Sequence, residues 1–277
     1  MVPVWNDIVL QTCDTADFRR PIAFGDDARY DWRMKPRRFL FTCAIAATLA
    51  VTAYAENTAI VPVPRTTVPT NWMAMHESFV QRAKQGNVDL LFLGDSITAG
   101  WLWGNGGLNI WKKVYERRHA ADFGIGWDRT QNVLWRIENG ELDGIKPKVV
   151  VLLIGTNNCG NEDDGKPRNT TPEIIEGVTT IVHELRTRLP DSKILLFGIF
   201  PRGDKSDPVR EQVKAVNAGL AKLDDGKMVK FMDIGSKLLQ PDGTLSRDIM
   251  PDLLHPNEKG YQIWSDALES QLAEMLK

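Results

Sequence analysis

The sequence predicts an α/β protein, a three-layer α/β/α sandwich built on about five parallel strands. Short runs of Val, Leu, Ile and Phe recur along the chain, and they are continuous rather than alternating with polar residues. Segments with helical periodicity separate these runs. Strands that are apolar on both faces, with helices between them, are typical of a parallel sheet covered on both sides. The sequence contains no internal repeat that would indicate a solenoid.

The apolar runs place the expected strands in order. They cover residues 89–94, 120–125 (the weakest run), 148–154, 194–200 and 228–233. The expected helices cover residues 72–84, 108–117, 130–138, 172–189, 209–223 and 259–276. Pro172 and Pro208 lie near the starts of two of these helices, where the missing N–H is tolerated.

The N-terminal part is expected to be removed from the working protein. Met34 is followed by a basic stretch, an apolar run over residues 39–51 and the small-x-small end Ala53-Tyr54-Ala55, which is the layout of a signal peptide over residues 34–55. An uncleaved membrane anchor is the alternative, but this run is short for a bilayer of about 30 Å. We expect translation to begin at Met34, with residues 1–33 a non-native or disordered extension.

The mature chain is then expected to hold a linker over residues 56–70 and one domain over residues 71–277. The linker is indicated by prolines at positions 62, 64 and 69. On this interpretation the protein is periplasmic or secreted, with no stable membrane span after cleavage. Its oligomeric state stays open, a homodimer included.

Composition excludes several classes of function. The 34 basic and 36 acidic side chains give a net charge of -2, so no nucleic-acid partner is expected. The three cysteines have no paired spacing, and no two of the four histidines stand three to five residues apart. We therefore expect neither a disulfide framework nor a metal or other cofactor.

Polar residues follow the expected strands at their carboxyl ends, the edge where open parallel sheets bind ligands. Ser96 comes directly after the first strand, within Gly94-Asp95-Ser96-Ile97-Thr98, as a candidate nucleophile or simply part of a helix cap. Thr98 stands where the Gly-x-Ser-x-Gly elbow would require glycine.

The next two strand ends offer hydrogen-bond donors. The second is the glycine loop Gly124-Ile125-Gly126-Trp127-Asp128, which by itself reads as a plain turn. The third is Gly155-Thr156-Asn157-Asn158, where an asparagine carboxamide suits a developing oxyanion or an ordinary turn.

The last motif, Asp252-Leu253-Leu254-His255, precedes the final helix. A carboxylate three residues before a histidine can accept its Nδ1 hydrogen and leave Nε2 as a base, although either residue can also be structural. Together these segments supply a nucleophile, oxyanion donors, a base and an orienting acid, the set that a serine esterase needs.

In this order the motifs resemble the SGNH (GDSL-type) hydrolases, and among them the platelet-activating factor acetylhydrolase IB catalytic subunits. Stretches 123–126, 130–136, 139–142 and 201–203 add to the resemblance, which extends from Trp72 to the last helix. It implies a flavodoxin-like fold and metal-independent hydrolysis of carboxylic esters. By position it implies Ser96 as nucleophile, His255 as general base and Asp252 as its orienting acid.

The resemblance also implies three oxyanion donors: the Ser96 N–H, the Asn157 side chain and the N–H of Trp127. Here the chain departs from the family, which commonly has glycine in place of Trp127. A backbone N–H survives this change, while the indole is expected to line or narrow the pocket. Cys159 stands where related subunits tend to have histidine, and we assign it no catalytic role.

Export and the resemblance favour acetyl or other short-chain esters, with a small-molecule or polysaccharide ester as substrate. A lipid acetyl ester or lysophospholipid is the alternative. A phosphate- or nucleotide-binding module is a rival from another class, but no Walker pattern is present. A non-catalytic carbohydrate-binding domain is a second rival, in which Trp101, Trp103 and Trp111 are exposed to grip sugars.

Overall fold

Five short strands form one parallel sheet in the computed structural model, which describes residues 56–276. The strands are β1 (Leu90–Gly94), β2 (Ala120–Gly124), β3 (Val149–Leu153), β4 (Lys193–Phe197) and β5 (Val229–Met232). They lie in the order β2-β1-β3-β4-β5, and all neighbouring pairs are parallel. This is the flavodoxin-like order, so the predicted α/β/α fold is confirmed.

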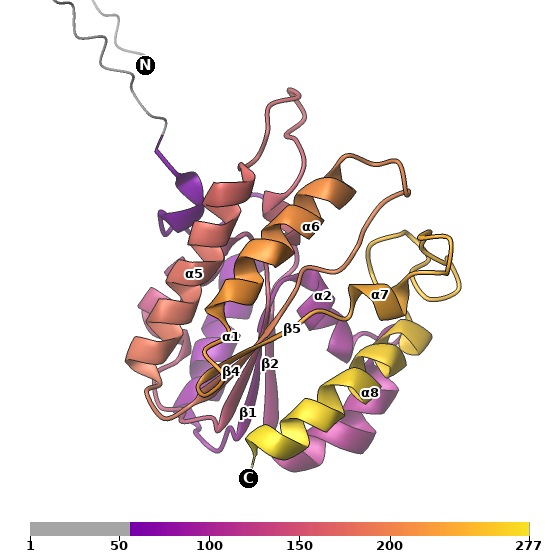
Figure 1. The fold of residues 1–277 in the computed structure, drawn as a ribbon. Coiled ribbons are helices and arrows are strands. Elements are labelled where there is room, and N and C mark those ends of the chain that lie inside the picture. Colours follow the sequence, from indigo (N-terminus) through magenta and orange to yellow (C-terminus); the bar gives the residue numbers. More distant parts are fainter. Residues whose placement is uncertain (1–55, 277) are drawn as a thin grey trace, which may run out of the picture. The chain divides into compact units, whose positions relative to one another are not determined.

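The two faces of the sheet carry separate apolar cores because side chains alternate along each strand. In β1, Leu91 and Leu93 belong to one core, while Leu90 and Phe92 belong to the other. Helices cover both faces (Figure 1). The first core includes residues of α1 (Trp72–Lys84), α4 (Thr130–Arg136), α5 (Thr171–Arg188) and α6 (Val209–Leu220); the second includes residues of α3 (Leu108–Ile110), α7 (Gly235–Leu238) and α8 (Glu258–Met275).

The helix expected over residues 108–117 is not one regular helix. After α3, the chain forms a π-helical turn at Trp111–Tyr115 and a 3₁₀ turn at Glu116–Arg118. The rings of Trp111 and Tyr115 both pack on Phe92, each with its centroid 5.1 Å away. Packing of these large rings in the core overrides the regular winding that the periodicity predicted.

The fourth strand ends three residues earlier than the sequence predicted. Gly198 still donates its N–H to Met232 of β5, but the N–H and carbonyl of Ile199 are both bonded to the Asn217 side chain on α6. The run to Phe200 remains apolar because it is buried. A helix side chain, rather than a neighbouring strand, satisfies its backbone.

Residues 56–70 differ from the expected extended linker. A 3₁₀ turn at Thr58–Ile60 buries Ala59, whose carbonyl accepts a hydrogen bond of 2.7 Å from Thr130. Asn132 donates to the Val63 carbonyl at 3.0 Å. Their contacts are with helices α4 and α5, far away in sequence, which local composition does not reveal.

The expectations for residues 1–33 and 34–55 lie outside the described residues. Within residues 56–276, no helix has the length and apolar character needed to cross a membrane.

Candidate active site

Ser96 lies at the start of a short helix, α2 (Ser96–Ala99), immediately after β1. The Asp95 side chain caps this helix by accepting the Ile97 N–H at 2.9 Å. Ser96 is the first helical residue, so its own N–H has no partner inside the helix. The strand-to-helix junction therefore presents both the Ser96 hydroxyl and its N–H at the carboxyl edge of the sheet.

The late loop brings a histidine and an aspartate to this hydroxyl. Ser96 Oγ lies 2.9 Å from His255 Nε2, and His255 Nδ1 lies 2.7 Å from Asp252 Oδ2. The other carboxylate oxygen of Asp252 accepts the N–H groups of His255 at 2.7 Å and Leu254 at 3.0 Å. The predicted Ser–His–Asp set is thus assembled in one continuous chain of hydrogen bonds.

The electrostatics of Asp252 suit an orienting carboxylate. Its partial burial acts to raise its pKa, but the hydrogen bonds from the His255 side chain and from two backbone N–H groups outweigh this, and the pKa is lowered. Leu253, between Asp252 and Leu254, has a left-handed backbone with φ 60°. This turn folds the loop back so that Asp252 reaches His255.

The second strand end forms a tight turn against the serine. Asp128 N–H bonds to the Ile125 carbonyl at 3.3 Å, and Trp127, the third residue of the turn, has φ 68°. A positive φ at that position is normally taken by glycine. A Cβ built on Gly126 would be 3.9 Å from the Ser96 Cβ, so the turn lies directly beside the serine.

The third strand end adds the carboxamide. Asn157 follows β3 in a 3₁₀ turn (Thr156–Asn158), is buried, and donates one Nδ2 hydrogen to the Asp128 carbonyl at 2.9 Å. A carboxamide nitrogen has two hydrogens, so one stays available. Asp128 follows Trp127 directly, so this bond places Asn157 against the turn that lies beside Ser96.

Behind the turn lies a buried charged cluster that the sequence analysis missed. Arg136 is fully buried and donates to the carbonyls of Gly94 (3.1 Å) and Phe123 (2.9 Å), in β1 and β2. Its guanidinium also bonds Glu141 at 2.8 Å and lies 2.9 Å from an oxygen of Asp128. Burial acts to lower the pKa of Arg136, but the two carboxylates outweigh it and the pKa is raised.

A signal for this cluster was present in the sequence. Arg136 stands three residues after Val133 and directly before Ile137, on the apolar face of the helix. A charge on such a face indicates a buried ion pair. The partners, Asp128 and Glu141, are identified only by the folded chain.

The model of the GDSL-like Lipase/Acylhydrolase family matches residues 92–263. The chain belongs to this family. The alpha1 subunit of platelet-activating factor acetylhydrolase IB from Bos taurus is 36% identical over 224 residues, covering 80% of this chain and 91% of the relative. The acylhydrolase is accordingly a carboxylic ester hydrolase.

Solved structures show the same fold. A GDSL-like lipase from Bacteroides thetaiotaomicron matches with a TM-score of 0.57 at 15% identity, covering 74% of this chain and 97% of that one. An acetylxylan esterase from Geobacillus stearothermophilus matches with a TM-score of 0.52 at 20% identity, covering 67% and 93%.

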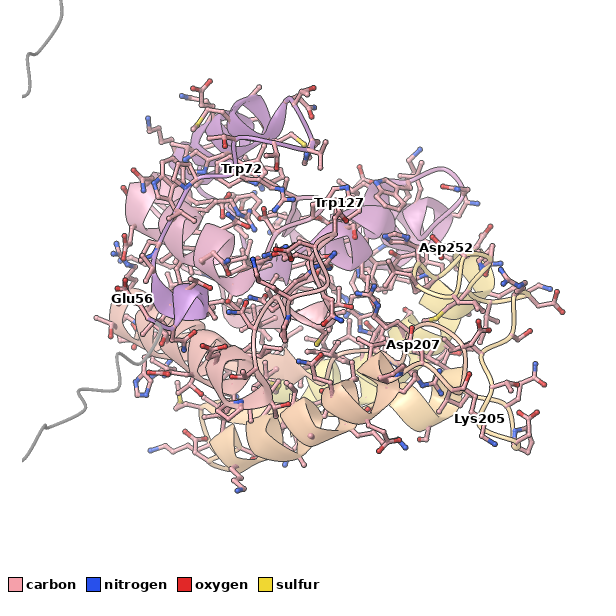
Figure 2. The ribbon with its side chains drawn as sticks, turned by 90° about the horizontal axis from the view of Figure 1, so that it is seen from above. Glu56, Trp72, Trp127, Lys205, Asp207 and Asp252 are labelled. Carbon is pink, nitrogen blue, oxygen red and sulfur yellow. The ribbon has the colours of Figure 1, made fainter. Side chains whose placement is uncertain are left out.

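Two exposed indoles flank the acylhydrolase's serine–histidine pair. Trp127 is 52% exposed and belongs to the turn beside Ser96, whereas Trp103 is 37% exposed, with its ring centroid 5.5 Å from that of His255. Figure 2 shows Trp127 between Trp72 and Asp252 in the view from above. The non-catalytic carbohydrate-binding alternative required Trp101 and Trp111 to be exposed as well, but both are buried in the second core.

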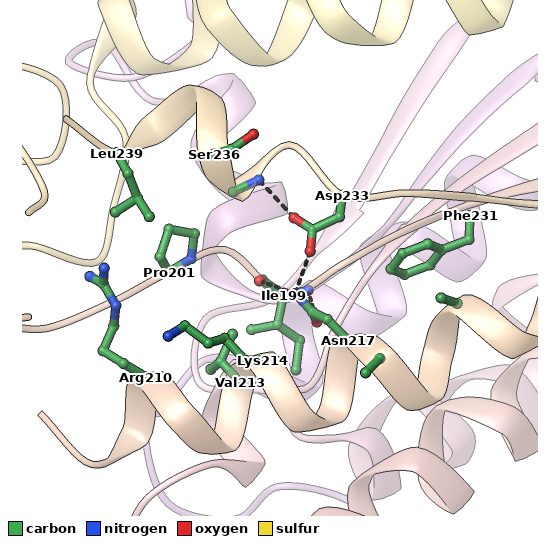
Figure 3. Close-up of a pocket in the computed structure, with 13 residues that line it drawn as sticks. Ile199, Pro201, Arg210, Val213, Lys214, Asn217, Phe231, Asp233, Ser236 and Leu239 are labelled. Carbon is green, nitrogen blue, oxygen red and sulfur yellow. Dashed lines mark hydrogen bonds between the residues drawn. The ribbon is translucent and has the colours of Figure 1, made fainter. Parts of the chain in front are cut away.

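Burial raises the pKa of the Cys159 thiol to about 12, so this buried thiol is unreactive. A cavity of about 490 Å³ lies between α6 and α7 and is lined by residues such as Val213, Phe231 and Asp233, without Ser96 or His255 (Figure 3). Among residues 56–276, no three His, Cys, Asp or Glu side chains are grouped as a metal site.

Proposed function

We propose that this acylhydrolase is an exported esterase that removes acetyl or other short acyl groups through an acyl-enzyme on Ser96. The observation that carries this proposal is the hydrogen-bonded chain from Ser96 Oγ to His255 Nε2 (2.9 Å) and from His255 Nδ1 to Asp252 (2.7 Å). This arrangement supports the roles of nucleophile for Ser96, general base for His255 and orienting acid for Asp252.

The reaction proceeds in two steps. Ser96 Oγ attacks the ester carbonyl while His255 Nε2 takes the hydroxyl proton, and the negative charge forms on the carbonyl oxygen. The N–H groups of Ser96 and Trp127 and the free hydrogen of Asn157 Nδ2 stabilise that charge. The alcohol leaves with the proton from His255, and a water activated by His255 then releases the acid and restores Ser96.

A carbohydrate carrier for the acyl group is supported by the two exposed indoles beside the site. Trp127 and Trp103 present flat apolar faces that suit the apolar face of a sugar ring. Trp127 holds this place despite a left-handed backbone that costs a non-glycine residue about 1–2 kcal/mol. A lipid acetyl ester or lysophospholipid is the competing substrate, in line with the names of the relatives.

The chemistry is tested with Ser96→Ala. We expect this variant to keep its fold, measured by circular dichroism and thermal unfolding, and to lose hydrolysis of p-nitrophenyl acetate together with labelling by a fluorophosphonate probe. Near-native turnover in Ser96→Ala would refute the assignment of the nucleophile.

The substrate is tested with a panel. Acetylated xylan and acetylated sugars are compared with lipid acetyl esters and with p-nitrophenyl esters of increasing chain length. We expect release of acetate from the sugars and a fall in rate with chain length. Trp127→Gly is expected to raise KM for the acetylated sugar while leaving the aryl acetate unaffected; preference for the lipids would replace the carbohydrate proposal.

Export is tested separately by sequencing the N-terminus of the natural protein recovered outside the cytoplasm. We expect it to begin near Glu56, whereas a mature protein that begins before Met34 would contradict both the signal peptide and the start site.

A further inference from the structure

Asp128 is bonded through both its side chain and its backbone, and the two sets of bonds face different parts of the molecule. Its carboxylate accepts the Trp72 indole N–H at 2.6 Å and lies 2.9 Å from Arg136 Nε. Its backbone carbonyl accepts Asn157 Nδ2 at 2.9 Å. The residue before it is Trp127, held at φ 68°. Asp128 therefore joins the interior to two of the expected oxyanion donors.

The interior partners of Asp128 are themselves fixed. Trp72 is 1% exposed at the start of α1, and Arg136 is fully buried. Arg136 is bonded to the carbonyls of Gly94 and Phe123, so it is attached to the sheet that also presents Ser96. Burial raises the pKa of Asp128 to about 7, against the opposing effects of Arg136 and Trp72. The hydrogen bond from Trp72 and the ion pair with Arg136 leave the Asp128 carboxylate little freedom to move.

We infer that Asp128 is the positioning residue of the oxyanion hole, with Trp72 and Arg136 holding its carboxylate so that its backbone keeps the Trp127 N–H and the Asn157 carboxamide aimed at the reacting carbonyl. A backbone turn that carries tryptophan in a left-handed conformation needs such an anchor, because its own preference favours another conformation. Without the anchor, Asn157 loses the carbonyl that orients its amide. This inference rests on the proposed function.

The test removes one hydrogen bond and leaves the reacting groups in place. Trp72→Phe deletes the indole N–H that Asp128 accepts. Trp264→Phe is the matched control, because Trp264 is also fully buried but its indole N–H has no hydrogen-bond partner within the described part of the chain. Both variants lose the same atoms from a tryptophan that is buried, so their losses in thermal stability are compared directly.

The readouts are kcat and KM for p-nitrophenyl acetate and the affinity of a trifluoromethyl ketone, which forms a serine hemiketal with an oxyanion. We expect Trp72→Phe to lower kcat and the ketone affinity together, each by about 10- to 100-fold, with KM unchanged. Trp264→Phe is expected to leave both at the wild-type level. A purely structural role for Trp72 predicts lower thermal stability with both readouts unchanged.

Unchanged kcat and ketone affinity in folded Trp72→Phe would overturn the inference. If that variant does not fold, Asp128→Asn answers the same question by the same readouts, since it keeps the shape of the side chain and removes the charge facing Arg136. Ser96→Ala distinguishes a failure of the proposed function from a failure of the role of Asp128. Activity in Ser96→Ala removes the proposed function, whereas an inactive Ser96→Ala beside a fully active Trp72→Phe removes only the role of Asp128.

Discussion

Replacement of Trp127 by glycine and by alanine measures the backbone strain in the turn beside Ser96. Both variants lack the indole, so the contacts of that ring cancel when the two are compared with each other. At φ 68°, the left-handed backbone destabilises the alanine variant by about 1–2 kcal/mol, whereas glycine adopts this conformation without that cost. Glycine loses about 0.5–1 kcal/mol more chain entropy on folding. The glycine variant should therefore be more stable by a net amount of roughly 0–1.5 kcal/mol, centred on about 0.75 kcal/mol.

For a domain of this size, the central value corresponds to about 1.5–3 °C in Tm. Urea denaturation and differential scanning fluorimetry measure it, and turnover of p-nitrophenyl acetate is measured on the same samples. We expect both variants to keep near-native turnover, because the proposed oxyanion donor is a backbone N–H. An alanine variant that is more stable than the glycine variant would refute the left-handed turn. A large loss of turnover in Trp127→Gly would show that the indole takes part in the chemistry.

The remaining predictions concern the triad and the buried charges. Asp252→Asn should lower kcat by about 10⁴-fold with the fold intact, because the amide no longer holds the His255 tautomer; a loss below roughly tenfold in an esterase assay would contradict this. Burial raises the pKa of Asp122 to about 8, above its unfolded value of 3.8, so the stability that its neutral form contributes is complete below pH 3.8 and is lost as the pH rises to about 8. Asp122→Asn should flatten the fall in unfolding free energy over that interval, and an unchanged pH profile would count against this protonation. Arg136→Met should lower the free energy of unfolding, measured by urea denaturation, by about 3–5 kcal/mol, because Asp128 and Glu141 then stay buried without their cation. A loss below about 1 kcal/mol, as for a surface ion pair, would show that the two carboxylates do not need Arg136.

The local pattern predicted the parts of the fold that depend on continuous burial. The strand at residues 89–94 was predicted to within one residue of β1, and the helix at residues 72–84 has the bounds of α1. These elements are regular and their pattern repeats with a single period. The pattern did not predict the end of β4, because the side chain of Asn217, on another element, replaces the sheet there.

The candidate site follows the same division. Ser96, Asn157 and the Asp252–His255 motif were expected at the ligand edge because each follows a strand or precedes the last helix. The Asp128–Arg136–Glu141 cluster was missed, although Arg136 lies on an apolar helix face, because the sequence does not identify the two carboxylates that pair with it. Trp101 and Trp103 stand two residues apart, yet one is buried and the other is 37% exposed.

By itself, the order of residues along this chain determined a parallel sheet with polar residues suited to catalysis at the carboxyl ends of its strands. Burial on both faces of a strand and the residue types of a turn are local requirements, so the sequence shows them directly. Only the tertiary structure decided which indoles face solvent, that residues 56–70 pack on α4 and α5, and that Asp128 is held by Trp72 and Arg136. These outcomes depend on contacts between distant segments, and such contacts form only when the chain closes around its two cores.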